Sequence, residues 1–410
     1  MRIAYLCADF GVKPMGRSGA SAHLQETVRA LRALGHTVEV YSASPDCDTP
    51  EAPAQGIHYV GLQGSAADVT RLLREEHAGL PDHLSREWQR LLYAEYCQQA
   101  LRQPLEAFEP DVIYERYSLF SYGGLELARR FDIPHILEVN APLSYEAATY
   151  RELVLRETAE ALEQSILTRT DGLIVVSHAL ADFARGLGVP DERIMVLPNG
   201  VDPEQFSPEV PGADIRERYG LSDRKVIGFV GTLKPWHDLD TLARAVDKLA
   251  ARDPGIHLLV VGDGPGRERL SGLDDTRMTC TGAVAYEEVP RFMAAMDVIV
   301  VPYGKDGDAY FSPLKLFEAM AMAKPVVGAR MGEVAHTLAD GTTGLLYEPG
   351  DADDMAAKIH TAIDGPGGPR ALGDAARRAV LGERTWEHNA RRTAELAQTL
   401  RTPSRSRRWA

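Results

Sequence analysis

The stretch FSPLKLFEAMAMAKPVV, residues 311–327, holds two residues whose types and spacing could do chemistry. Ser312 and Pro313 predict a helix start, because a serine hydroxyl can accept an unpaired backbone N–H and proline fits the first helical position. Lys315 then falls in the first turn, where the helix dipole favours an anion over a cation. The lysine becomes favourable if an anion binds the free N–H groups of the helix start. Glu318 follows one turn later on the same face.

The same pair has a structural explanation, since residues three apart on a helix can form an ion pair that contributes about 0.2–0.5 kcal/mol. Metal chemistry finds less support. DxD triplets, which can hold a divalent metal, begin at Asp46, Asp238, Asp306 and Asp351. Their contexts are turns or helix starts, so we expect no metal. The chain also contains no GxSxG, HExxH or P-loop motif.

The composition indicates a globular chain of two or three domains, with 410 residues of which 44% are hydrophobic and 25% charged. A net charge of −14 argues against nucleic acid as a partner. The four cysteines form no CxxC pair, which fits a reducing compartment. No apolar run approaches 18 residues and the N-terminus does not resemble a signal peptide. We therefore expect a cytoplasmic location, with a disordered basic tail over 401–410.

Short β-branched or aromatic runs alternate with stretches of helical period, which predicts an α/β fold of two doubly wound parallel sheets in tandem. The first set of strands is expected at 3–8, 37–43, 111–116, 135–140, 173–177 and 194–198. The second set is expected at 226–233, 257–264, 297–303, 325–330 and 344–348. The Pro- and Gly-rich segment 198–212 is the best candidate linker. Ligands bind beyond the carboxyl ends of such strands, so two facing sheets would place a cleft between the domains.

Two glycine-rich loops follow predicted strands. In the first, Gly16, Gly19 and Ala20 precede a helix expected from near Ser21 to Gly35 and would let backbone approach a ligand closely. The spacing is not GxGxxG and no acidic residue ends the next strand, so a nicotinamide enzyme is disfavoured; a loop needed only for packing is the alternative. The second loop, VVGDGPGRERL, reads mainly as a structural turn.

Taken together, the motifs resemble a known family. The chain contains GHTVEVY, SHALADFARGLGVPDERIMVLPNGVDPEQF, VGTLKPWHDLDTL, VVGDGP, TGAVAYEEVP, DVIVVPY, SPLKLFEAMAMAKPVV and GTTGLLYEPGD. In this order they resemble the retaining glycosyltransferases of family 4, which have the GT-B fold of two Rossmann-like domains. The resemblance extends over nearly the whole chain.

The resemblance implies an N-terminal acceptor-binding domain, 1–200, to which a helix at 384–400 returns, and a C-terminal nucleotide-sugar donor domain, 201–383. It implies hexosyl transfer from an NDP-sugar to a small-molecule or glycan acceptor, with retention, by front-face attack, and with neither cofactor nor metal. Membrane association is not indicated, because RLLREEHAGLPDHLSREWQRLL mixes both charges. A homodimer is left open.

The resemblance also assigns residues to the site. The expected catalytic residues are Lys315, from its place at the helix start, together with Asn140 and His237, which stand at family site positions. The implied donor-binding residues are Gly19, Ala20, Thr232, Lys234, Gly262, Val284, Tyr310, Ser312, Pro313, Leu314 and Glu318. Candidate acceptor contacts are His23, Arg116, Glu138 and Glu146, for which hydrogen bonding within loops is an equal alternative.

This sequence departs from the family pattern at three positions. Tyr310 stands where the first glutamate of the E-x7-E motif is usual, while Glu318 keeps the second, which holds the donor ribose. Thr232 and His237 stand in place of the usual basic pair. A protonated His237, Lys315 or Lys234 would have to supply the missing charge. These departures keep a non-catalytic sugar-binding homologue as an alternative, beside an NDP-sugar epimerase or a phosphorylase of the same architecture.

Overall fold

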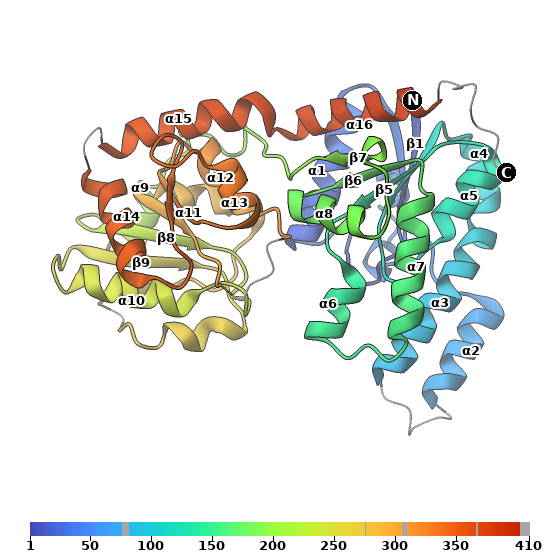
Figure 1. Ribbon diagram of the computed structural model, residues 1–410, viewed down its shortest axis with the longest axis horizontal. Coiled ribbons are helices and arrows are strands. Elements are labelled where there is room, and N and C mark those ends of the chain that lie inside the picture. The colour runs from blue at the N-terminus through green and yellow to red at the C-terminus, as the bar shows by residue number, and fades with distance from the viewer. Residues whose placement is uncertain (76–81, 275, 306–309, 366–367, 402–410) are drawn as a thin grey trace. The chain divides into compact units, whose positions relative to one another are not determined.

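The computed structural model describes residues 1–75, 82–274, 276–305, 310–365 and 368–401 (Figure 1). The chain forms two compact units. Unit 1 is Met1–Pro198 with Asn389–Ala410, and unit 2 is Asn199–His388. The DxD triplet at Asp306 and the basic tail beyond Arg401 lie outside the described residues. Within the described ranges, no helix is long and apolar enough to cross a membrane.

Unit 1 is built on a seven-stranded parallel sheet with the order β3-β2-β1-β4-β5-β6-β7. Its strands are β1 (Arg2–Cys7), β2 (Thr37–Ser42), β3 (Ile57–Tyr59), β4 (Val112–Arg116), β5 (His135–Val139), β6 (Gly172–Val175) and β7 (Ile194–Val196). The register pairs Cys7 with Arg116 and Arg116 with Glu138, so the ends of the three central strands lie side by side. The strand order reverses at β1, where doubly wound sheets bind ligands.

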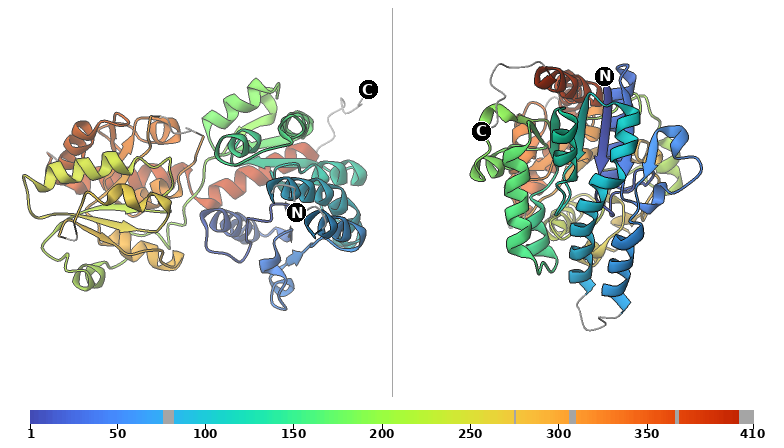
Figure 2. Two further views of the ribbon diagram at one scale, coloured as in Figure 1. Left: turned by 90° about the horizontal axis from the view of Figure 1, so that it is seen from below. Right: turned by 90° about the vertical axis from the view of Figure 1, so that its right-hand side faces the viewer.

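Helices cover both faces of this sheet (Figure 2). They are α1 (Gly19–Ala33), α2 (Gly64–Glu75), α3 (Asp82–Ala100), α4 (Arg102–Phe108), α5 (Gly123–Phe131), α6 (Leu143–Tyr150), α7 (Arg156–Arg169), α8 (His178–Gly186) and, from the end of the chain, α16 (Trp386–Arg401). Short 3-10 turns are η1 (Pro45–Cys47), η2 (Pro53–Gln55) and η3 (Asp191–Arg193).

Helix α1 begins two residues earlier than its sequence predicts. Ser18 is the N-cap, and its hydroxyl accepts a hydrogen bond from the backbone N–H of Ser21, so Gly19 and Ala20 form the first helical positions. The expected end is correct, because Gly35 follows the helix with φ +81°, a left-handed conformation that glycine adopts without steric cost.

Unit 2 is built on a six-stranded parallel sheet with the order β10-β9-β8-β11-β12-β13. Its strands are β8 (Lys225–Val230), β9 (Ile256–Val261), β10 (Met278–Cys280), β11 (Val298–Val301), β12 (Val326–Ala329) and β13 (Leu345–Tyr347). The central strands are buried on both faces, as the runs IHLLVV and VIVV require. Their side chains form one continuous hydrophobic core with the surrounding helices.

The helices of unit 2 also lie on both faces of its sheet (Figure 2). They are α9 (Ala213–Arg218), α10 (Leu239–Ala250), α11 (Val289–Ala294), α12 (Leu314–Ala321), α13 (Gly332–Thr337), α14 (Ala352–Asp364) and α15 (Gly368–Glu383). Two 3-10 turns, η4 (Pro265–Leu270) and η5 (Tyr286–Glu288), follow β9 and β10.

The boundary between the units falls at the start of the predicted linker. From Asn199 onward this segment belongs to unit 2, where Phe206 is fully buried and Val201 bridges to Thr385. The apolar anchors explain why a Pro- and Gly-rich composition is ordered here. Helix α16 packs on unit 1, with Leu396 and Leu400 against Gly172 of β6.

All eleven predicted strands are present, and two more in the described chain were not predicted. Strands β3 and β10 have three residues each and lie at the outer edges of their sheets. An edge strand so short carries no hydrophobic run, so IHY and MTC do not stand out from the flanking loops.

A close contact between α15 and the end of α12 yields a stability prediction. A Cβ added at Gly373 would lie 1.9 Å from the carbonyl oxygen of Ala323, just after α12, whereas one added at Gly382 would meet nothing within 4 Å. We expect Gly373→Ala to lower the free energy of unfolding by about 1–3 kcal/mol through overpacking. Gly382→Ala on the same helix should leave it unchanged or raise it by up to about 1 kcal/mol. Urea denaturation measures both, and equal effects would contradict the contact.

Candidate functional site

The start of helix α12 differs from its prediction. Pro313 is the N-cap, with ψ 110°, and the Ser312 side chain makes no capping hydrogen bond. Instead, the Ser312 hydroxyl accepts from the Asn199 backbone N–H at 2.9 Å, and the Ser312 carbonyl accepts from the Asn199 side-chain amide at 2.6 Å. Ser312 therefore fixes the entry to α12 against the first residue of unit 2, and it does not cap the helix.

Lys315 occupies the second position of α12 and is buried, with 9% of its surface exposed. Its Nζ lies 3.0 Å from Nε2 of His237 and 4.4 Å from the centroid of the Phe229 ring. Gly231 leaves room for the ammonium, because a Cβ there would lie 3.0 Å from Nζ. Among the described residues no carboxylate lies within ion-pair distance of Lys315, although the charge of Glu318 acts on it and raises its pKa. Lys315 and Glu318 are therefore coupled without a direct ion pair.

Burial determines the charge state of both partners. It lowers the pKa of Lys315 to about 7, and the nearby Glu318 carboxylate offsets only part of this effect. Burial, followed by the charge of Lys315, lowers the pKa of His237 to about 2. His237 is thus neutral near pH 7, and the expectation that it supplies a positive charge is wrong. Its Nε2 is an acceptor to which the ammonium of Lys315 donates.

Glu318 faces a partner that the sequence analysis did not identify. Its Oε1 accepts a hydrogen bond of 2.9 Å from the hydroxyl of Tyr286, in the turn after β10. Burial raises the pKa of Glu318 to about 7, although Tyr286 and Lys315 act in the opposite direction. A further hydrogen-bond donor would therefore stabilise the charged form of this buried carboxylate. Val284 lies two residues before Tyr286 and is partly buried against the core of unit 2.

The loops after β8 and β9 touch each other through glycines. A Cβ at Gly262 would lie 2.1 Å from the carbonyl oxygen of Gly231, and Gly262 has φ +141°. The reading of VVGDGPGRERL as a structural turn agrees with this contact, since Gly262 lets the loop that carries Thr232 and His237 pack closely. Lys234, in the same loop, lies 5.7 Å from the Trp236 ring centroid.

Aromatic rings surround this loop. Trp236 stacks on Phe311 at 5.0 Å, and Tyr303 contacts both His237 and Phe311. Tyr310, which replaces the usual carboxylate, is buried and lies 4.3 Å from Phe311 between ring centroids. The position thus contributes packing in place of a charge.

Unit 1 gathers polar residues around Glu138, at the ends of its central strands. One carboxylate oxygen, Oε1, lies 2.9 Å from His23 Nε2 and accepts from Arg116 at 3.1 Å and from Asn140 Nδ2 at 2.5 Å. The other oxygen accepts from the Tyr114 hydroxyl. The structure therefore brings four of the residues selected from the sequence into one cluster.

The electrostatics of this cluster favour an ionised Glu138. Burial alone would raise its pKa, but His23, Arg116 and the Tyr114 hydroxyl hold the pKa far below its usual range. Glu146 does not join the cluster; it lies on α6 and pairs with Arg151, whose side chain is 62% exposed. Glu146 stands eight residues after Glu138 in the sequence, and helix α6 carries it to a different partner.

The described DxD triplets have structural roles. Asp238 caps α10 by accepting from the Thr241 N–H, and Asp351 caps α14 by accepting from the N–H groups of Asp353 and Asp354. Asp46 accepts from the Met15 N–H at 3.1 Å. These carboxylates are occupied by backbone donors in each case.

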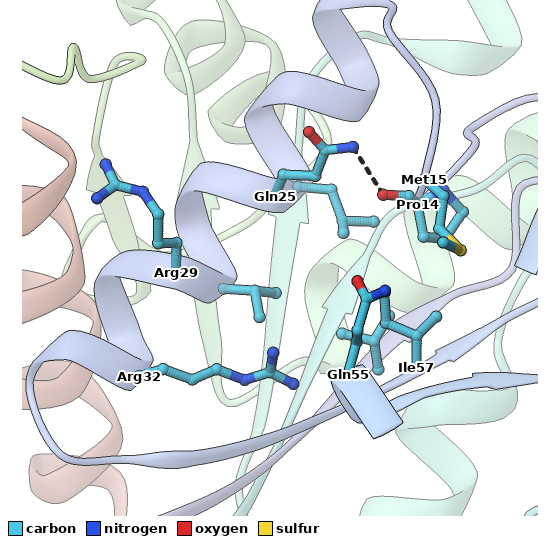
Figure 3. A pocket seen from close by; sticks show the side chains of 10 residues that line it. Pro14, Met15, Gln25, Arg29, Arg32, Gln55 and Ile57 are labelled. Carbon is cyan, nitrogen blue, oxygen red and sulfur yellow. Dashed lines mark hydrogen bonds between the residues drawn. The ribbon is translucent and has the colours of Figure 1, made fainter. Parts of the chain in front are cut away.

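A cavity of about 420 Å³ lies in unit 1, beside α1 and β2 (Figure 3). Leu24, Val28, Val40 and Ile57 form apolar parts of its lining, and Arg29 and Arg32 add charge. Gln25 donates to the Pro14 carbonyl at 2.8 Å and so ties the loop after β1 to the helix (Figure 3). The lining contains no member of the Glu138 cluster, so we do not assign sugar chemistry to this cavity.

Two parallel sheets with polar residues at the ends of their central strands define the class, an α/β protein of two Rossmann-like units. The sequence profile described as "Glycosyltransferase Family 4" matches residues 17–205, and that described as "Glycosyl transferases group 1" matches residues 224–364. A D-inositol 3-phosphate glycosyltransferase from Stackebrandtia nassauensis is 30% identical over 400 residues, which cover 92% of this chain and 83% of that protein.

Further relatives agree. A GDP-mannose-dependent alpha-mannosyltransferase from Mycolicibacterium smegmatis is 28% identical, with 94% of each chain covered. Sucrose-phosphate synthase from Thermosynechococcus elongatus has a similar fold, with TM-score 0.73, 24% identity and coverage of 98% and 99%. Anabaena HepE, solved with UDP and glucose, has TM-score 0.72, 20% identity and coverage of 98% and 100%. The chain belongs to glycosyltransferase family 4 and has the GT-B fold; it is a glycosyltransferase.

The Glu138 cluster predicts a large difference between two glutamates of unit 1. Glu138→Gln leaves the buried Arg116 guanidinium without its carboxylate, and we expect a loss of about 3–5 kcal/mol in the free energy of unfolding. The same substitution at Glu106 of α4, whose i,i+4 pair with Arg102 is about half exposed on both sides, should change it by less than about 1 kcal/mol. Urea denaturation near pH 7.5 compares the two. A cost below 1 kcal/mol for Glu138→Gln would contradict the cluster.

Proposed function

We propose that the enzyme transfers a hexosyl group from an NDP-sugar to an acceptor hydroxyl with retention at the anomeric carbon, without a metal. The observation that carries the proposal is the buried ammonium of Lys315, which has no carboxylate partner in the described chain and stands at a helix start. A diphosphate is the dianionic group that would complete this site. Family membership and relatives whose names state GDP-mannose dependence support the same donor class.

The donor diphosphate binds at the first turn of α12. The N–H of Leu316 already donates to the Pro313 carbonyl, so the N–H groups of Leu314 and Lys315 are the ones available at this end. These groups, the helix dipole and the Lys315 ammonium all favour a negative charge at one place. Glu318, one turn further, accepts hydrogen bonds from the donor ribose beside Tyr286.

In the transfer step, the acceptor oxygen attacks the anomeric carbon from the face that the diphosphate leaves. The bond from C1 to the phosphate oxygen breaks, the bond from C1 to the acceptor oxygen forms, and the acceptor proton passes to the departing phosphate. Negative charge grows on the diphosphate in the transition state, which is where preorganised donors and cations accelerate a reaction most. Lys315 therefore acts on the leaving group.

Metal independence is supported by the DxD triplets at Asp238 and Asp351, whose carboxylates cap helices. On the acceptor side, unit 1 contributes Asn140, which Glu138 holds by a 2.5 Å hydrogen bond. Arg116 and His23 fix Glu138 in turn and do not need to contact the acceptor themselves.

A donor panel that includes GDP-mannose and UDP-glucose tests the proposal, with NDP release measured by chromatography in the presence and absence of EDTA. We expect slow hydrolysis of one donor, faster release with acceptor, no effect of EDTA, and an anomeric configuration that NMR shows to be retained. Binding of a donor without turnover across the panel would support a non-catalytic homologue and contradict the proposal.

Replacement of the cation should lower the rate of transfer. Lys315→Met keeps the buried chain but removes the charge, and we expect kcat to fall by about 10²- to 10³-fold, the typical effect of losing one transition-state donor. Lys248→Met removes an exposed cation that pairs with Asp353 and serves as the matched control. If both variants kept wild-type kcat, Lys315 would have no part in the reaction.

Glu318 should decide recognition of the ribose. Wild-type enzyme should bind the 2′- and 3′-deoxy forms of its product NDP more weakly than the ribonucleotide, because a buried carboxylate left without its donor is costly. In Glu318→Gln this discrimination should shrink at least tenfold, measured by calorimetry. Equal discrimination in wild type and variant would remove Glu318 from the ribose site.

A further inference from the structure

His237 is held rigidly in the loop after β8. The residue is 5% exposed, and its ring packs edge-on against Phe229 with the ring centroids 5.2 Å apart and lies 5.4 Å from the ring centroid of Tyr303. The backbone around it is also fixed, because the His237 N–H donates to the Lys234 carbonyl at 3.1 Å and its carbonyl accepts from Leu239. In this packing Nε2 of the imidazole is directed at Nζ of Lys315, 3.0 Å away.

Few charged groups act on this contact. On α12, Glu318 acts on Lys315 and is itself bonded to Tyr286 from the η5 turn. On the β8 loop, Lys234 acts on His237, and Asp238 follows as the cap of α10. From the loop after β11, the neutral phenol of Tyr303 faces the ring, and burial raises the pKa of this phenol above its usual range. Lys315 is thus the only cation within hydrogen-bond distance of the imidazole in the described part of the chain.

We propose that His237 is a positioning residue, whose neutral imidazole accepts a hydrogen bond from Lys315 and keeps that ammonium charged and directed at the donor diphosphate. The inference rests on the proposed function. It reverses the role expected for this position, since the loop supplies an acceptor and helix α12 supplies the charge. His237 stands where the family usually has a basic residue, and Lys315 supplies the positive charge that is missing there.

The proposal has a pH consequence with a definite sign. Lysine is charged below its pKa, so activity that needs the Lys315 ammonium falls as pH rises through the pKa of Lys315 in the free enzyme, which burial lowers to about 7. An acceptor at Nε2 stabilises the ammonium. Its removal lowers the pKa of Lys315 further and moves the loss of activity to lower pH.

The test compares His237→Leu with His237→Gln, which retains an acceptor oxygen but cannot titrate. The readout is kcat/KM against pH, with the donor that wild-type enzyme turns over. We expect the alkaline limb of His237→Leu to lie about one pH unit below that of wild type, the size expected from losing a hydrogen bond to a charged group. In His237→Gln, the alkaline limb of the kcat/KM profile should lie close to its wild-type position.

A purely structural role gives a different result. If His237 only fills space between Phe229 and Tyr303, His237→Leu lowers kcat/KM at every pH without moving the limb, and the proposal is overturned. A limb that moves equally in His237→Gln also overturns it. Thermal melting of each variant confirms that the folded enzyme is compared.

Proton uptake on binding provides a second measurement that does not need turnover. GDP and UDP are titrated at pH 7 in buffers of different ionisation enthalpy, and the one that binds wild type is used. We expect His237→Leu to take up more protons per nucleotide than wild type, because more of its Lys315 starts neutral; equal uptake overturns the inference. If neither nucleotide binds wild type and no donor is turned over, the proposed function itself is contradicted. Failure of the proposed function is thus distinguished from failure of the inference about His237.

Discussion

The candidate site of unit 2 depends on the ammonium of Lys315. Among the described residues, no carboxylate forms a direct ion pair with this charge. Lys315 is buried at the start of α12, over the face of Phe229 and against the neutral ring of His237. An aromatic face and an imidazole nitrogen stabilise an ammonium only partly, so burial still lowers the pKa of Lys315 to about 7. A bound diphosphate, as proposed above, would remove this cost.

The surrounding structure keeps that charge in place. Gly231 and Gly262 allow two loops to approach at a distance that no side chain would permit, and this brings the β8 loop to Lys315. Ser312 fixes the entry to α12 through two hydrogen bonds to Asn199, and Gly373 of α15 packs against its exit. In unit 1 the buried charge is a carboxylate. Hydrogen-bond donors surround Glu138 and keep it ionised.

The sequence was sufficient for the fold class and for the longer strands and helices, because buried parallel strands leave continuous β-branched runs. It also identified Lys315 through a local conflict with the helix dipole. It could not reveal the N-cap at Pro313, the neutrality of His237 or the Tyr286 partner of Glu318. Each of these depends on tertiary contacts between loops far apart in the chain, and Tyr286 looked like an ordinary residue of a polar turn.

The most direct test of the account is the pKa of Lys315 itself, measured by NMR on protein with 13C-labelled lysine side chains and assigned with Lys315→Met. We predict a titration near pH 7 in the free enzyme, well below the usual value of about 10.4. Saturating nucleoside diphosphate should raise it by more than one unit, because the bound anion stabilises the ammonium. A Lys315 resonance that titrates near 10.4 with and without nucleotide would contradict the account.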